Sequence, residues 1–192
     1  EDLFTTYVIG NQSLRSECWL NEPTRIKFEV LWRALPTNQR SREQFYQSIL
    51  DAQTIHTFFA DEIIRLPQVS ADVLEPLKRL TTHLYTKTKD LAGIKTQANS
   101  SIEQHYQQFI TINRSELCFL CGTSLLSQNR AGLDDDEQWR SDYDHLLCKD
   151  KYPVFSVHPG NFIPTCHICN SKAKGKRNLL IRAGYLRRLA FY

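Results

Sequence analysis

Two cysteine pairs constrain this chain more than any other feature. Cys118 and Cys121 form the first pair and Cys166 and Cys169 the second, each with two residues between its cysteines. This spacing lets both thiolates of a pair bind one ion from a tight turn, and zinc accepts four sulfur ligands in a tetrahedron. The pairs therefore predict a structural Zn2+ site whose ligand shell is full. Disulfides and redox-active thiols are the alternatives, but the paired spacing favours zinc in a reducing compartment.

The composition is that of a folded domain without a membrane anchor. Of the 192 residues, 41% are apolar, which is enough for a packed core, and 23% are charged, which argues against disorder. No run of apolar residues is long enough to cross a bilayer. The first residues, Glu1 to Phe4, have neither a basic nor an apolar leader segment. We therefore expect a cytoplasmic protein with no membrane partner.

The first part of the chain, residues 1–115, is predicted to be a mostly helical domain of unknown role. Apolar residues spaced by three or four predict one buried stripe on each helix. Pro36 and Pro67 end two of these stretches, because proline breaks a helix interior. Ser41 with Gln44 has the spacing of a capping box and predicts a helix start. The expected helices cover residues 22–35, 41–66, 70–84 and 102–110.

The character of the sequence changes near Ser115, where helical periodicity gives way to short apolar runs, turns and cysteines. This change predicts a second domain over residues 116–192, with the zinc site and a basic C-terminal helix. The fold class is therefore α+β. Because the link between the domains is short, we expect the helical part to pack against the zinc unit.

Charge is distributed unevenly, although the net charge is only +3. No acidic residue follows Asp150, whereas an acidic run covers residues 134–137. A C-terminal segment whose charged residues are all basic is typical of a protein that binds a phosphate backbone. A solvated basic face is the alternative. The basic residues after Asp150 are Lys151, Lys172, Lys174, Lys176, Arg177, Arg182, Arg187 and Arg188. Those predicted to bind nucleic acid are Lys172, Lys174, Lys176 and Arg177.

Three polar residues lie between or beside the cysteine pairs in an arrangement that suggests a catalytic site. Residues 141–147 predict a short strand that carries Asp144 and His145, and residues 161–164 predict a second strand. The chain then turns through the second cysteine pair into a helix that carries Asn170. Two strands and a helix folded around zinc would bring Asp144, His145 and Asn170 together.

These side chains match the needs of phosphodiester hydrolysis. His145 suits the general base, since imidazole titrates near neutrality. Asp144 and Asn170 offer the hard oxygen ligands that Mg2+ or another divalent ion prefers. Lys172 and Lys174 would hold the flanking phosphates.

The motifs of residues 118–176 resemble those of the HNH (ββα-metal) nuclease family, in the subgroup with two CxxC zinc knuckles. The strings that carry the resemblance are Asp144-His145, Asn161-Phe162-Ile163-Pro164, and Cys166-His167-Ile168-Cys169-Asn170-Ser171-Lys172. The resemblance implies that His145 is the base, Asp144 the first ligand of a catalytic divalent ion, and Asn161 a brace for the base and its loop. Asn170 takes the last position of the motif, often histidine, and remains a metal ligand.

The sequence thus predicts an HNH-type endonuclease that acts on DNA, with RNA not excluded. One alternative is a zinc-knuckle module that binds nucleic acid without cutting it. Another is a protein-interaction module, in which the acidic run of residues 134–137 is the docking patch. By analogy with the family, the helical region could dock onto a protein such as an ATPase in an anti-phage defence system.

Overall fold

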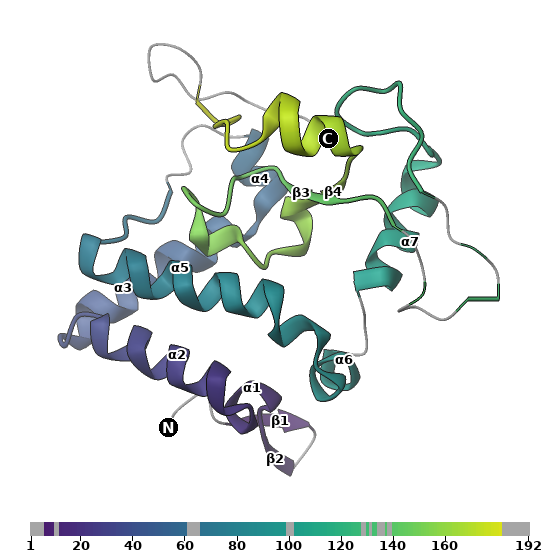
Figure 1. The fold of residues 1–192 in the computed structure, drawn as a ribbon. Helices are drawn as coiled ribbons and strands as arrows, with labels where there is room; N and C mark the ends of the chain where they lie inside the picture. Colours follow the sequence, from purple (N-terminus) through teal and green to yellow (C-terminus); the bar gives the residue numbers. More distant parts are fainter. Residues whose placement is uncertain are drawn as a thin grey trace.

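A computed structural model gives the arrangement of the chain (Figure 1). It describes residues 6–9, 12–60, 66–98, 102–127, 130, 132–133, 137 and 140–181. Parts of two predicted charge clusters fall outside these residues: Asp134, Asp135 and Asp136 of the acidic run, and Arg182, Arg187 and Arg188 of the basic tail. Within the described part of the chain, no helix combines the length and apolarity that a bilayer crossing requires.

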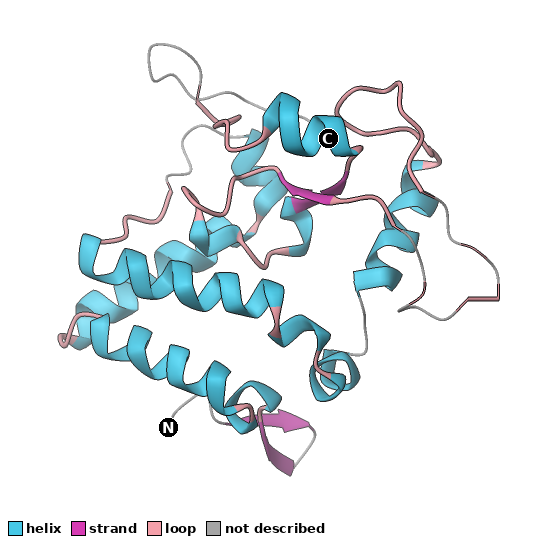
Figure 2. Ribbon diagram, in the orientation of Figure 1, coloured by secondary structure: helices cyan, strands magenta, loops and turns pink. Residues whose placement is uncertain are grey.

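The structure is mostly helical, with two short antiparallel hairpins (Figure 2), so its class is α+β. The strands are β1 (Thr6–Ile9), β2 (Gln12–Arg15), β3 (Tyr143–His145) and β4 (Phe162–Pro164). The α-helices are α1 (Glu17–Leu20), α2 (Glu22–Ala34), α3 (Gln39–Gln53), α4 (Ile55–Ala60), α5 (Ala71–Thr86), α6 (Ala92–Ala98) and α7 (Ile102–Asn113). Three 3-10 turns, η1 (Thr88–Asp90), η2 (Pro153–Phe155) and η3 (Pro159–Asn161), and the π-helix η4 (Ile168–Lys174) complete the described elements.

Helices α2, α5 and α7 confirm three predicted helices, because their end signals are local in sequence. The side chain of Asn21 caps α2 by accepting from the backbone N–H of Thr24 at 3.1 Å, and Pro23 lies in the first turn. Ser70 stands at the N-cap position of α5, as predicted. Pro76 lies in its second turn, and the helix continues to Thr86.

The predicted long helix from Ser41 to Leu66 is wrong in two places. Its start lies earlier, because Asn38 is the N-cap residue of α3 and accepts from the backbone N–H of Ser41 at 3.1 Å. Its course is broken at Thr54, whose backbone leaves the helical region with φ −76° and ψ 72°. The chain turns there into α4, and the part of the expected stripe at Ile63 lies outside the described residues.

The largest apolar cluster joins the two predicted domains. Phe58 of α4 is fully buried and stacks against Phe155 of η2, with ring centroids 5.2 Å apart. The other buried members of this cluster are Ala52, Ile55, Phe59, Leu146, Leu147, Tyr152, Ile163 and Leu180. We call the part of the chain up to Ser115 the helical region and the part from Glu116 onward the cysteine-containing region. The two regions pack against each other, as the short link predicts.

Helix α5 also connects the two regions (Figure 1). It packs against α2 on one side and against η2 on the other. Val73, Leu77 and Leu80 form its buried stripe. Tyr85, near its C-terminal end, faces the hairpin of β3 and β4. The predicted strands over residues 141–147 and 161–164 correspond to this hairpin, in which Asp144 lies opposite Ile163.

Candidate active site and metal centre

The four cysteines of the two CxxC pairs come together as predicted. Their sulfur atoms all lie within 4.8 Å of one another, so they could hold one zinc ion. Cys118 and Cys169 are buried, whereas Cys121 is exposed. This cluster contacts Leu126 and, from the helical region, Ile110 of α7.

The first cysteine pair lies on a tight turn that the backbone shapes for metal binding. The N–H of Gly122 donates to the carbonyl of Cys118 at 2.8 Å, and Gly122 has a φ of 65°, a left-handed conformation that suits glycine. The second pair approaches from the other side, where the N–H of Cys166 donates to Sγ of Cys118 at 3.3 Å. Hydrogen bonds from Thr123 lower the pKa of Cys121 to about 5, which favours the thiolate that zinc requires.

Strand β3 carries Asp144 and His145 into a pocket of about 340 Å³ that both regions of the molecule line. Asn170 and Lys174 enter it from η4, and Tyr85 enters from α5. The structure thus brings together three of the predicted catalytic residues, Asp144, His145 and Asn170, in one cavity.

The imidazole of His145 is buried and fixed by three neighbours. Its Nε2 lies 3.0 Å from the carbonyl oxygen of Ser156, which can accept only if Nε2 carries the proton. Tyr85 and Phe162 pack edge-on against the ring, with centroids 4.6 and 5.0 Å away. Among the described residues, Nδ1 has no hydrogen-bond partner, so the fixed tautomer leaves an unprotonated nitrogen. Burial lowers the pKa of His145 to about 4, and the positive charges of Lys149 and Lys174 act in the same direction.

Asn161 braces the loop between β3 and β4 and does not enter this pocket. Its side-chain oxygen accepts from the N–H of Leu147 at 2.7 Å. Its amide donates to the carbonyls of Leu147 and Phe155 at 3.1 and 2.9 Å. The residue is fully buried, and these three bonds join both ends of the loop whose carbonyl at Ser156 orients His145.

Asp144 forms a buried ion pair with Lys174. The Lys174 Nζ lies 2.8 Å from Oδ1 of Asp144, and the two side chains are only 4% and 6% exposed. The other carboxylate oxygen, Oδ2, is buried and has no partner among the described residues. Burial raises the pKa of Asp144, and the hydrogen bond and charge of Lys174 act against this shift.

The remaining predicted nucleic-acid contacts differ from Lys174 in exposure. Lys172, Lys176 and Arg177 are exposed, and Lys176 also lines the pocket. Lys174 instead lies inside the pocket wall. A phosphate at the surface could bind Lys174 only if this side chain left its ion pair with Asp144.

Tyr85 and Lys149 contribute to the site but are not among the predicted residues. Tyr85 belongs to the helical region, and no local motif marks it as part of a pocket that is built mainly by residues 143–176. Lys149 lies above its ring, with Nζ 5.2 Å from the centroid, and also lines the pocket. Helix α5 therefore supplies one wall of the candidate active site.

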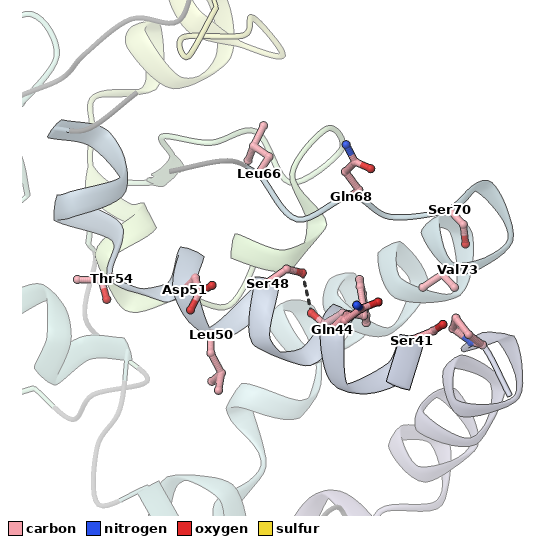
Figure 3. Close-up of a pocket in the computed structure, with 12 residues that line it drawn as sticks. Ser41, Gln44, Ser48, Leu50, Asp51, Thr54, Leu66, Gln68, Ser70 and Val73 are labelled. Atoms are coloured by element: carbon pink, nitrogen blue, oxygen red, sulfur yellow. Dashed lines mark hydrogen bonds between the residues drawn. The ribbon is translucent and has the colours of Figure 1, made fainter. Parts of the chain in front are cut away.

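A larger hollow of about 990 Å³ lies between α3 and the segment that leads into α5 (Figure 3). It shares no lining residue with the pocket at Asp144. Ser41, Gln44 and Ser48 line it from α3, and Asp51 is the one charged residue among its lining. Among the described residues a single carboxylate stands there without a base or a cation beside it, so these residues form no constellation for catalysis.

Comparison with protein-family models, with curated proteins and with solved structures found no match for this chain.

Proposed function

We propose that this protein is a metal-dependent endonuclease of the HNH type, with its active site in the pocket at Asp144 and His145. The observation that carries the proposal is that Asp144, His145 and Asn170 line one pocket, in which the carbonyl of Ser156 fixes the imidazole of His145. A base with one defined unprotonated nitrogen is what water activation requires. The short β3–β4 hairpin followed by η4 is consistent with the strand, strand and helix order of the ββα-metal motif.

In this proposal His145 accepts a proton from the attacking water at Nδ1. The carbonyl of Ser156 holds the Nε2 proton and stabilises the imidazolium that forms. Because burial keeps the pKa of His145 far below neutrality, the ring is unprotonated at pH 7, but it is a weaker base than the near-neutral imidazole that the sequence predicts. Asn161 acts as a positioning residue, since its three hydrogen bonds hold the loop that carries Ser156.

Asp144 and Asn170 are the proposed ligands of a catalytic divalent ion. Oδ2 of Asp144 is a buried acceptor that has no donor among the described residues, which suits a cation, and Asn170 lines the same pocket. Mg2+ commonly takes one or two protein oxygens and keeps several waters, so this small donor set fits such an ion. When bound, the ion would supply positive charge for the phosphate oxygens and the leaving group.

The four cysteines are proposed to hold a structural zinc, since a shell of four sulfurs leaves no open position for substrate. The substrate is proposed to be DNA, with the exposed Lys172, Lys176 and Arg177 as phosphate contacts. A binding module without catalysis would use the same exposed cations. The buried Asp144 favours the nuclease, because a module that only binds phosphate needs no carboxylate in its pocket.

Plasmid cleavage with Mg2+ or Mn2+ tests the proposal. We expect the wild-type protein to nick or cut the plasmid, and His145→Ala to lose about a hundred-fold or more of the rate. His158→Ala is the matched control. The ring of His158 bonds the carbonyl of Gln53 and the N–H of Gly160 and does not line the pocket. Equal rates for wild type and His145→Ala would remove His145 from the mechanism. DNA binding without any cleavage would instead support the binding module.

A further inference from the structure

The buried ion pair of Asp144 and Lys174 has a consequence for how this site takes up its metal. We propose that the Lys174 ammonium competes with the divalent ion for Asp144, and that a nucleic-acid phosphate removes this competition by giving Lys174 a new partner. The inference rests on the proposed function, because it takes Asp144 as a metal ligand.

The first step is the position of the ammonium. Nζ of Lys174 contacts Oδ1 of Asp144 at 2.8 Å inside a wall that excludes solvent. A divalent ion bound by this carboxylate would stand beside a fixed positive charge, and repulsion between two cations is strong where water cannot screen it. Oδ2 of Asp144 can hold an ion only weakly beside this charge, so tight metal binding requires Lys174 to move away from Asp144.

The second step is the charge around the pocket. Lys149, Lys174 and Lys176 line it together with Lys78, while Asp150 is the second carboxylate of the lining and lies 3.9 Å from Lys78. A divalent ion added to this set leaves a large excess of positive charge. Each phosphodiester brings one negative charge and several acceptor oxygens, which neutralise the excess and bind an ammonium well.

The third step is the short backbone segment that links Lys174, which competes with the metal, to Asn170, a proposed metal ligand. Asn170 and Lys174 both lie on η4, where the N–H of Gly175 donates to the carbonyl of Asn170 at 3.0 Å. Gly175 ends this π-helix with φ 49° and ψ −126°, a conformation that side chains other than glycine rarely adopt. The same short element thus presents a metal ligand and the cation that opposes metal binding. Short π-helical segments are often found at functional sites.

Together these features predict positive coupling between metal and nucleic acid. The free protein should bind a divalent ion weakly, and a bound phosphate backbone should raise the affinity for that ion. By linkage, the bound ion should raise the affinity for nucleic acid by the same factor. The site would then load its ion mainly when substrate is present.

Mn2+ binding to the full chain tests this coupling directly. Affinity is measured by calorimetry or by electron paramagnetic resonance at pH 8, with and without a short DNA duplex, in a His145→Ala background that does not cut. We expect Lys174→Met to raise the Mn2+ affinity of the DNA-free protein by about ten-fold or more, because a charged hydrogen bond no longer has to be broken. The duplex should raise the affinity of the parent by a similar factor and that of Lys174→Met much less.

Lys176→Met is the matched control, since it removes one positive charge from the same pocket at an exposed position. Asp144→Asn should abolish Mn2+ binding at this site. If Lys174→Met does not fold, Lys174→Gln keeps a donor for Asp144 without the charge and should shift the affinity in the same direction. Equal affinities for the Lys174 and Lys176 variants would overturn the competition. No Mn2+ binding by any variant, with or without DNA, would instead contradict the metal site of the proposed function.

Discussion

The helical region and the cysteine-containing region are stabilised in different ways. Helices α2 and α5 are regular elements of more than three turns that pack against each other, and α5 buries an apolar stripe. Strands β3 and β4 have three residues each, and turns join them. The second region shares an apolar cluster with α4 and adds polar and metal-type links to it: the four-cysteine cluster, the three bonds of Asn161 and the Asp144–Lys174 pair.

This difference explains where the candidate chemistry lies. Short strands and turns can hold buried polar side chains close together, provided that strong local links add to the apolar cluster that the two regions share. The long helices then serve as a wall, and α5 presents Tyr85 to His145. A catalytic pocket built in this way needs both regions, although most of its polar groups come from one of them.

The largest expected effect comes from removing the proposed zinc. A chelator or Cys169→Ser should unfold most of residues 116–181, because a four-cysteine zinc site contributes on the order of 10 kcal/mol of folding free energy. Hydrogen exchange of the backbone amides compares the stability of the two regions after zinc removal. Amides of the α2–α5 pair should keep more protection than those of β3, β4 and η4.

The matched control for this substitution is Cys18→Ser, which removes a half-buried thiol outside the cluster. It should leave the metal content and the exchange pattern unchanged. Simultaneous loss of protection in both regions after zinc removal would break the distinction between them. A purified protein without zinc would show that the cluster has another role.

A smaller effect is expected from Asn161→Ala, which tests the polar links without touching the cysteines. The substitution leaves the N–H and carbonyl of Leu147 unpaired in the interior, and the carbonyl of Phe155 keeps only the N–H of His158 as a donor. We expect a loss of about 3 kcal/mol or more in the free energy of unfolding, measured by urea denaturation. Asn178→Ala removes a single bond, to the N–H of Leu180, and should cost about 1 kcal/mol. Similar losses for both variants would show that Asn161 is not a special brace.

The elements that the sequence predicts well are those whose signals are local. Pro23 and Pro36 delimit α2, and the CxxC spacing predicts a cluster that the structure contains. Asp144 and His145 lie on a short strand, as predicted.

The features that escape prediction depend on pairs far apart in sequence. Lys174 is predicted as a phosphate contact, but its partner Asp144 lies 30 positions away and only the fold brings them together. Tyr85 carries no motif, and its contact with His145 depends on how α5 packs. The break at Thr54 likewise follows from the burial of Phe58 and Phe59 of α4 in the shared core, which the helical periodicity alone does not predict.

The smallest expected effect concerns the start of α3 and sharpens the account of the helical region. Asn38 caps this helix through the N–H of Ser41, whereas the capping-box pattern assigns that role to Ser41 itself. Asn38→Ala should therefore cost about 1 kcal/mol and lower the melting temperature by about 2–4 °C. Ser41→Ala keeps the backbone donor and should change the stability by less than about 0.5 kcal/mol. Thermal denaturation of the two variants decides whether Asn38 or Ser41 caps the helix. If Ser41 were the cap, Ser41→Ala would lose more stability than Asn38→Ala. The same measurement would show whether one local hydrogen bond determines where α3 starts. Such local signals are what we expect in the helical region, whereas the cysteine-containing region depends on contacts between residues far apart in the sequence.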